Sequence, residues 1–92
     1  MIINVKEKLN LLGRHAKDKV TNFQGVITSI AFDLYGCNQA LLNPGIDNEG
    51  KLRDQNWFDI NRLEVAGSPI MDVPEFDTSK EKGAEFKPTF KN

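Results

Sequence analysis

The chain has 92 residues, of which 39% are hydrophobic and 27% are charged, and its formal net charge at pH 7 is -1. This composition is that of an ordinary globular domain and excludes the disordered and membrane-spanning classes, since no apolar run approaches the roughly 18–20 residues that cross a bilayer. The N-terminal sequence lacks the apolar core and cleavage site of a signal peptide, so we expect a cytoplasmic protein with no membrane partner.

Residues 1–13 are predicted to form a lead-in segment before the folded domain. Their apolar residues fit neither a helical nor an alternating period, and Gly13 would end a helix if one formed. Helix and strand therefore both stay open for this segment. The apolar residues are Ile3, Val5, Leu9, Leu11 and Leu12.

The next stretch predicts two strands joined by a turn. Residues 14–20 are expected to be an edge strand protected by lysines, and residues 21–25 a turn, because Asn22 and Gly25 tolerate a positive φ. Residues 26–34 alternate in polarity and form the second strand. Its predicted core face carries Val26, Thr28, Ile30, Phe32 and Leu34.

A two-residue turn at Tyr35-Gly36 is predicted to lead into a third strand. Side chains directly opposite each other in such a hairpin share one face of the sheet. Cys37 is therefore expected on the buried face. The predicted pairs are Leu34 with Cys37, Phe32 with Gln39, and Ile30 with Leu41.

The remaining elements complete an all-β fold. Residues 43–50 are rich in turn formers and predict an exposed loop or hairpin tip. Residues 55–59 read as a fourth strand, Ile60-Asn61-Arg62 as a single tight turn, and residues 63–66 as a fifth strand. Five short strands without a long helix predict a small five-stranded antiparallel SH3-like barrel over residues 14–66, as a single domain with a thin core.

Residues 67–92 are predicted to be an extended, partly flexible C-terminal tail. They hold three of the four prolines and show no period. The tail nevertheless has too many apolar residues for a pure spacer, so we expect residues 70–76 to lie across the barrel or a neighbouring subunit, and the segment from about Thr78 onward to be flexible. The apolar residues are Ile70, Met71, Val73, Phe76, Phe86 and Phe90.

The residue content argues against an enzyme or a metalloprotein. Cys37 is the only cysteine and His15 the only histidine, so the chain forms no internal disulfide and no Cys-based zinc site. A thiolate with a histidine base is disfavoured because the predicted register buries Cys37. Asp59 is expected to cap the turn that follows it, and Glu64 to pair with Arg62 or a lysine. We expect no catalytic residue, no metal and no cofactor.

Four blocks of this sequence resemble a known group of proteins. Lys17 to Thr28 (KDKVTNFQGVIT), Tyr35-Gly36-Cys37, Trp57-Phe58-Asp59 and Leu63-Glu64-Val65 are similar to small uncharacterised proteins encoded by tailed phages and by bacterial mobile gene cassettes such as those of integrons. The likeness spans about residues 12 to 75 and includes Val73-Pro74, although a Gly often stands in that group where this chain has Asn22. The resemblance implies an SH3-like barrel that assembles with itself, and it implies no known chemistry.

Aromatic residues near strand ends and the apolar tail form the candidate interaction surface. Trp and Tyr are residues that often anchor interfaces, and alternation sends Trp57 and Phe58 to opposite sides, so at least one should be exposed or covered by the tail. The leading hypothesis is a non-enzymatic interaction module that forms a homo-oligomer and binds an unknown protein partner. The candidate residues are Phe23, Tyr35, Trp57, Phe58, Ile70, Met71, Val73 and Phe76.

Two details of this hypothesis specify how copies would meet. The exposed edge at residues 14–20 would pair with a second chain, and the tail residues would fill a groove beside Trp57 or Phe58. The alternative function is a nucleic-acid-associated accessory protein that uses the same basic edge, since small barrels can combine cations with stacking rings. Its candidate contacts are Arg14, Lys17 and Lys19.

Overall fold

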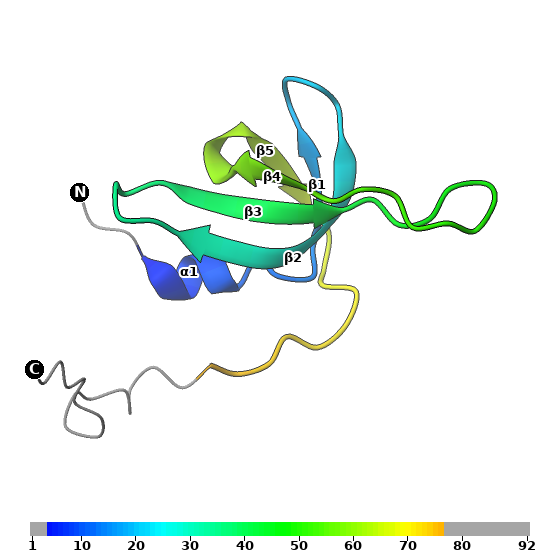
Figure 1. The fold of residues 1–92 in the computed structure, drawn as a ribbon. Coiled ribbons are helices and arrows are strands. Elements are labelled where there is room, and N and C mark those ends of the chain that lie inside the picture. Colours follow the sequence, from blue (N-terminus) through cyan, green and yellow to red (C-terminus); the bar gives the residue numbers. More distant parts are fainter. Residues whose placement is uncertain (1–3, 77–92) are drawn as a thin grey trace, which may run out of the picture.

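The structure is a computed structural model that describes residues 4–76. A short helix precedes a strongly curled sheet, and an extended segment follows it (Figure 1). In chain order the elements are α1 (Val5–Leu9), β1 (His15–Asp18), β2 (Gln24–Phe32), β3 (Asn38–Asn43), β4 (Asn56–Asp59), the 3-10 turn η1 (Ile60–Arg62) and β5 (Leu63–Ala66).

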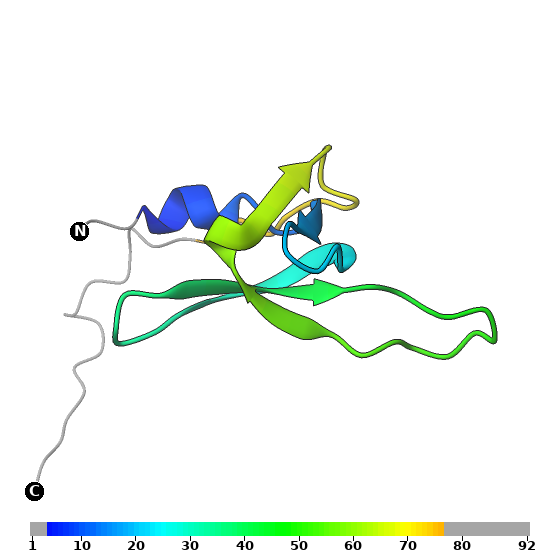
Figure 2. The same ribbon diagram turned by 90° about the horizontal axis from the view of Figure 1, so that it is seen from above.

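The predicted antiparallel five-stranded sheet is confirmed, with the strand order β4-β3-β2-β1-β5. In Figure 2, α1 and β5 lie on the same side of the layer formed by β2, β3 and β4, so the sheet curls around its core as twisted sheets do. Within the described chain β4 pairs only with β3, and β5 pairs only with β1. The sheet is therefore not closed into a barrel by hydrogen bonds between its two edges.

The lead-in segment is a helix followed by tight turns. Its N-cap is Asn4, whose side chain accepts a hydrogen bond from the Glu7 backbone N–H at 3.0 Å. Gly13 then adopts a φ of +85°, which a residue with a side chain rarely takes, and the chain turns into β1. Leu11 and Leu12 pack against the core of the sheet, so this segment belongs to the folded domain.

β1 is an interior strand, so the prediction of an exposed edge at residues 14–20 is wrong. Its Ala16 lies opposite Gly25 of β2 on one side and opposite Val65 of β5 on the other. The error arises because a lysine-rich strand resembles a protected edge, whereas here one face of β1 is buried and the lysines lie on the other. Among residues 4–76, the strands at the two edges of the sheet are β4 and β5.

The core lies on the inner face of the curled sheet. In β2, the alternation of inward and outward side chains shifts by one residue partway along the strand. A register shift between Ile27 and Ser29 inserts a bulge at Thr28, so the inward set is Gly25, Ile27 and then Ile30. The buried core residues are Ala16, Ile27, Ala40, Leu42, Ile60 and Leu63, with Leu11, Leu12, Phe23, Ile30, Phe58 and Val65 packed against them.

Most of the predicted core face of β2 is therefore wrong. Ile30 does pack against the core. Val26 precedes the bulge, Thr28 forms it, and both belong to the outer face. Phe32, the last residue of β2, is 39% exposed. Leu34 lies beyond the end of the strand and is 88% exposed. Strict alternation cannot foresee a bulge, which shifts the phase of every residue that follows it.

Gly25 permits the close approach of β2 and β3. A Cβ atom at this position would lie 2.6 Å from the Asn43 carbonyl oxygen, a distance that real Cβ contacts do not reach. Gly25 is therefore part of β2 and not the end of the preceding turn. The predicted positive φ of that turn is supplied by Asn22, at +69°.

The connection between β2 and β3 is longer than the predicted two-residue turn. Residues 33–37 form a loop in which the Asp33 carboxylate accepts hydrogen bonds from the backbone N–H groups of Tyr35 and Cys37, each at 2.9 Å. Phe32 consequently pairs with Asn38, one residue away from the predicted register. Cys37 lies in this loop and is exposed, so its predicted burial is also wrong.

Candidate interaction surface

The fourth strand presents an aromatic residue on a sheet edge that is unpaired within the described chain. Trp57 lies opposite Leu41 of β3 on the outer face of the sheet, and 46% of its surface is exposed. The next residue, Phe58, lies opposite the buried Ala40 and packs against the core. Phe58 and Trp57 of β4 therefore point to opposite faces of the sheet, as alternation predicted, with Phe58 packed against the core and Trp57 half exposed.

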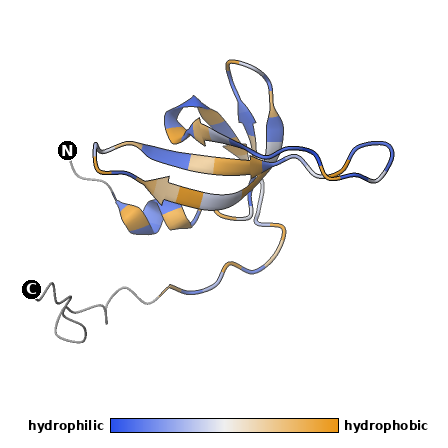
Figure 3. Ribbon diagram, viewed as in Figure 1, coloured by the Kyte–Doolittle hydropathy of each residue, from blue (hydrophilic) through white to orange (hydrophobic). Residues whose placement is uncertain are grey.

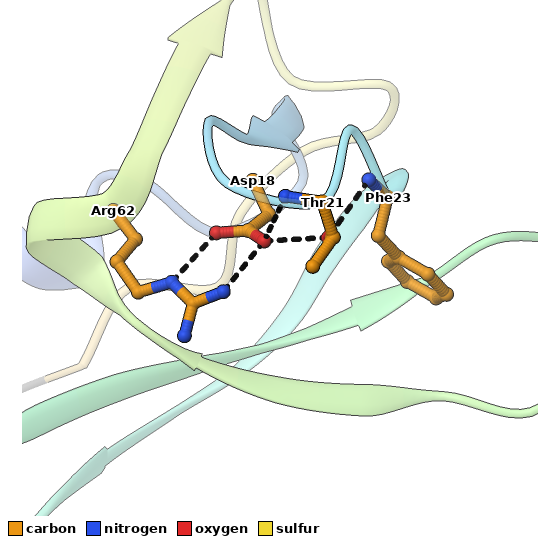
Figure 4. Close-up of polar contacts among 4 residues, drawn as sticks. All are labelled: Asp18, Thr21, Phe23 and Arg62. Carbon is orange, nitrogen blue, oxygen red and sulfur yellow. Dashed lines mark hydrogen bonds and ion pairs between the residues drawn. The ribbon is translucent and has the colours of Figure 1, made fainter.

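A polar and aromatic cluster holds the junction between β4 and β5 in place. The ring of Phe58 lies 5.3 Å from that of Phe23, centroid to centroid, and the Arg62 guanidinium lies 5.5 Å from the Phe58 centroid. The same guanidinium donates from Nε and Nη2 to the two carboxylate oxygens of Asp18, at 2.8 and 2.7 Å (Figure 4). This bidentate pair ties the end of β1 to η1 across 44 positions of sequence.

Asp18 is fully buried, and both of its carboxylate oxygens accept hydrogen bonds. Besides Arg62, the backbone N–H and the hydroxyl of Thr21 donate to Asp18 Oδ2 (Figure 4). The hydrogen bonds from Arg62 hold the pKa of the Asp18 carboxyl well below its ordinary value of 3.8, against the opposing effect of burial. The same contact raises the pKa of Arg62. We infer that these contacts stabilise the fold.

Because the pKa of Asp18 is lowered, its carboxylate should contribute to the free energy of unfolding at neutral pH and lose this contribution in acid. A carboxyl with a depressed folded-state pKa stabilises the fold at pH values above its unfolded value, and the contribution is lost as the pH falls below 3.8 toward the folded value. We expect Asp18→Asn to be less stable than the wild type at neutral pH and the difference to shrink progressively below pH 3.8. Denaturant unfolding of both proteins across this range measures it, and a difference that stays constant would contradict the assigned role of Asp18.

The segment after β5 lies against the N-terminal part of the same chain. The Ile70 backbone N–H donates to the Gly13 carbonyl at 2.9 Å. Beyond it the apolar residues of the segment alternate with polar ones (Figure 3), and Ile70, Met71 and Phe76 are 67%, 69% and 50% exposed. An apolar groove of about 280 Å³ separates the segment from Leu12 and β2. A second groove, whose lining is both polar and apolar, lies between residues 73–76 and α1.

Within one chain, this segment lies against α1, Leu12 and β2. Val73 and Phe76 line both grooves, whereas Trp57 and Phe58 line neither. The predicted tail from Asp77 onward, including Phe86, Phe90 and the expected flexible part, lies outside the described residues.

The three basic candidates do not form one free patch. Arg14 donates from Nη1 to the Gly67 carbonyl at 2.6 Å and from Nε to the Asn10 carbonyl at 2.9 Å. Lys17 Nζ lies 3.7 Å from Glu64 Oε1 on the adjacent strand β5, which confirms the expected lysine partner of Glu64. Among the described residues, Lys19 has neither an ion pair nor a side-chain hydrogen bond, whereas Arg14 is held by its two carbonyl contacts and Lys17 by its ion pair.

A broad groove among the described residues also lacks these three cations. It has a volume of about 710 Å³ and lies between the turn after β1 and the hairpin that joins β3 to β4. His15, Phe23 and Arg53 contribute to its lining together with polar residues, and Arg14, Lys17 and Lys19 do not. The three basic candidate residues thus lie outside the lining of this groove.

Several exposed apolar residues were not among the predicted candidates. Tyr35 was a candidate interaction residue and is 85% exposed. Its neighbour Leu34 was assigned to the core but is 88% exposed. Val20, Ile46 and Leu52 are also exposed, at 72%, 58% and 80%. Their turn context was the available signal, because a single apolar residue among Asn, Asp and Gly has no neighbour to pack against.

The polar connections behave as ordinary turns. Asp59 accepts a hydrogen bond from the Asn61 backbone N–H at 2.8 Å, so its predicted capping role is confirmed. Asp47 accepts from the backbone N–H groups of Glu49 and Lys51, which lowers its pKa. Across residues 4–76, no group of three or more His, Cys, Asp and Glu side chains is arranged to hold a metal ion.

Comparison of the chain with protein-family models, curated proteins and solved structures found no match. Among the helical segments between residues 4 and 76, none has the length and hydrophobicity of a bilayer-spanning helix.

Proposed function

We propose that this protein is a non-enzymatic interaction module of a phage or mobile element, which associates with itself and binds a further protein. The observation that carries the proposal is the open β4 edge, which combines unpaired main-chain groups with the half-exposed Trp57. Unpaired strands invite pairing with another chain, and Trp is a residue that most often anchors an interface. The exposed side chains of Ile70, Met71 and Phe76 offer a second apolar surface.

The proposal includes membership of the SH3-like barrels. The strand order β4-β3-β2-β1-β5, the 3-10 turn that joins the two edge strands and the curl of the sheet all support it. In such an arrangement the edges approach each other without pairing, and they stay available to other chains. An interaction module follows naturally from this architecture.

The alternative, a nucleic-acid-associated accessory protein, has weaker support. Arg14 and Lys17 are held by contacts within the chain, and the formal net charge is -1. Neutralised or dispersed cations release few counterions and give little affinity for phosphate.

Absolute mass in solution tests the proposed function directly. We expect light scattering after size exclusion to give a mass above the 10.4 kDa of one chain, with little change between low and high salt, because apolar contacts and main-chain hydrogen bonds are not screened as ion pairs are. A single-chain mass at every concentration would contradict self-association. Binding to single- or double-stranded nucleic acid that weakens as salt rises would favour the alternative.

A further inference from the structure

We propose that self-association, if the proposed function holds, takes place between the β4 strands of two copies. They would pair antiparallel about a two-fold axis perpendicular to the sheet and centred on Trp57. Each open sheet would thereby continue into the other. The most frequent symmetry of soluble oligomers is this two-fold one, in which the same surface serves both copies.

The two edge strands, β4 and β5, differ in how well each could pair with the same strand of a second copy. β5 carries Glu64 on the outer face, and a symmetric pair centred there would set two carboxylates directly opposite each other. β4 carries one charged residue, Asp59, at its very end, and no Lys or Pro that would guard the edge. β4 is therefore the edge that accepts a second copy of itself.

A two-fold axis perpendicular to the sheet keeps the outer faces of both copies on one side. With the axis at Trp57, this residue lies opposite Trp57 of the second copy. Leu41 already lies opposite Trp57 within each chain, so the paired sheets place two leucines and two tryptophans in one row. Trp57, which is 46% exposed in one chain, then has an apolar neighbour in the second copy.

The charges around β4 also complement each other in this register. Asp59 lies opposite position 55 of the second copy, where Gln55 offers amide donors to the carboxylate. Arg53 stands two positions further along and is a diagonal neighbour, at a separation that a long side chain can reach. No two like charges are directly opposite between positions 53 and 61, so the strand is complementary to itself in charge as well as in shape.

The first test replaces Trp57 with Glu and compares it with Leu34→Glu. Leu34 is 88% exposed and lies in the loop between β2 and β3, outside β4. We expect the dimer mass to fall to that of one chain in Trp57→Glu, because two carboxylates would face each other, and to stay unchanged in Leu34→Glu. Since a strand of four residues buries less than a standard interface, both variants and the wild type are measured over a dilution series.

A second test traps the pairing of the two β4 backbones covalently. In a Cys37→Ser background, Trp57→Cys would place two thiols opposite each other, and the 4.5–5.5 Å between paired Cα atoms suits a disulfide. We expect mild oxidation to yield a covalent dimer rapidly. Leu34→Cys in the same background is the exposed control and should crosslink slowly, by random collision.

The outcomes separate this inference from the function on which it rests. A wild-type dimer that Trp57→Glu leaves intact, or equal crosslinking of the two cysteine variants, would overturn pairing through β4 while self-association stands. A wild type with the mass of one chain at every dilution would overturn both. Melting curves of all variants show that each one is folded before its mass is interpreted.

Discussion

Ile27→Ala is expected to lower the free energy of unfolding by about 2–5 kcal/mol, a large part of the stability of a domain of this size. Ile27 is fully buried at the centre of β2 and belongs to the core with Ala40 and Leu42. Its truncation leaves a cavity, since strands anchored on both sides cannot collapse into the space. Denaturant unfolding followed by the fluorescence of Trp57 measures the loss.

Phe32→Ala is the matched control, because it removes more atoms from the same strand. Phe32 is 39% exposed at the end of β2, so we expect a cost of about 1 kcal/mol, typical of a partly exposed position. Alternation alone would assign the larger effect to Phe32. If Phe32→Ala unfolded the protein and Ile27→Ala did not, the bulge at Thr28 would be wrong.

The second large effect is expected from Arg62. Arg62→Ala removes both donors from the buried Asp18 carboxylate and the cation above the Phe58 ring, and an uncompensated buried charge is strongly destabilising. We expect a loss well above the roughly 0–1 kcal/mol that an exposed pair such as Lys17 with Glu64 contributes. Thermal unfolding of both alanine variants gives the comparison.

Arg62→Lys separates charge from geometry. A lysine keeps the positive charge but cannot bind both carboxylate oxygens through a planar fork. We expect its stability to fall between those of the wild type and Arg62→Ala. Equal stability of Arg62→Ala and Lys17→Ala would mean that the contact seen in Figure 4 does not hold the β1 end against η1.

The two proposals assign different tasks to the two faces of β4. Phe58 on the inner face belongs to the cluster that positions η1, whereas Trp57 on the outer face has no such role and remains half exposed. Substitution of Trp57 should therefore change association with little effect on folding. Substitution of Phe58 should do the reverse, because its ring packs against Phe23.

Local features were predictable because they depend on neighbours a few positions away. The five strands, the tight turn at Ile60–Arg62 and the capping role of Asp59 were all recognised from turn formers and alternation. The helix Val5–Leu9 was not, because five residues give too short a period to identify. The loop at residues 33–37 was predicted as a two-residue turn. The prediction failed because the Asp33 carboxylate accepts two backbone hydrogen bonds, which stabilise a longer loop.

The sequence by itself determined the five strands of the sheet, the tight turn at Ile60–Arg62 and a surplus of apolar residues for one small core. Only the tertiary structure decided which residues of β2 face inward, since the bulge at Thr28 arises from pairing with β3. It also placed β1 between β2 and β5 and joined Asp18 to Arg62. These features depend on contacts between segments far apart in the chain, which no local pattern encodes. The free edge of β4, and with it the candidate interaction surface, is a consequence of that long-range pairing.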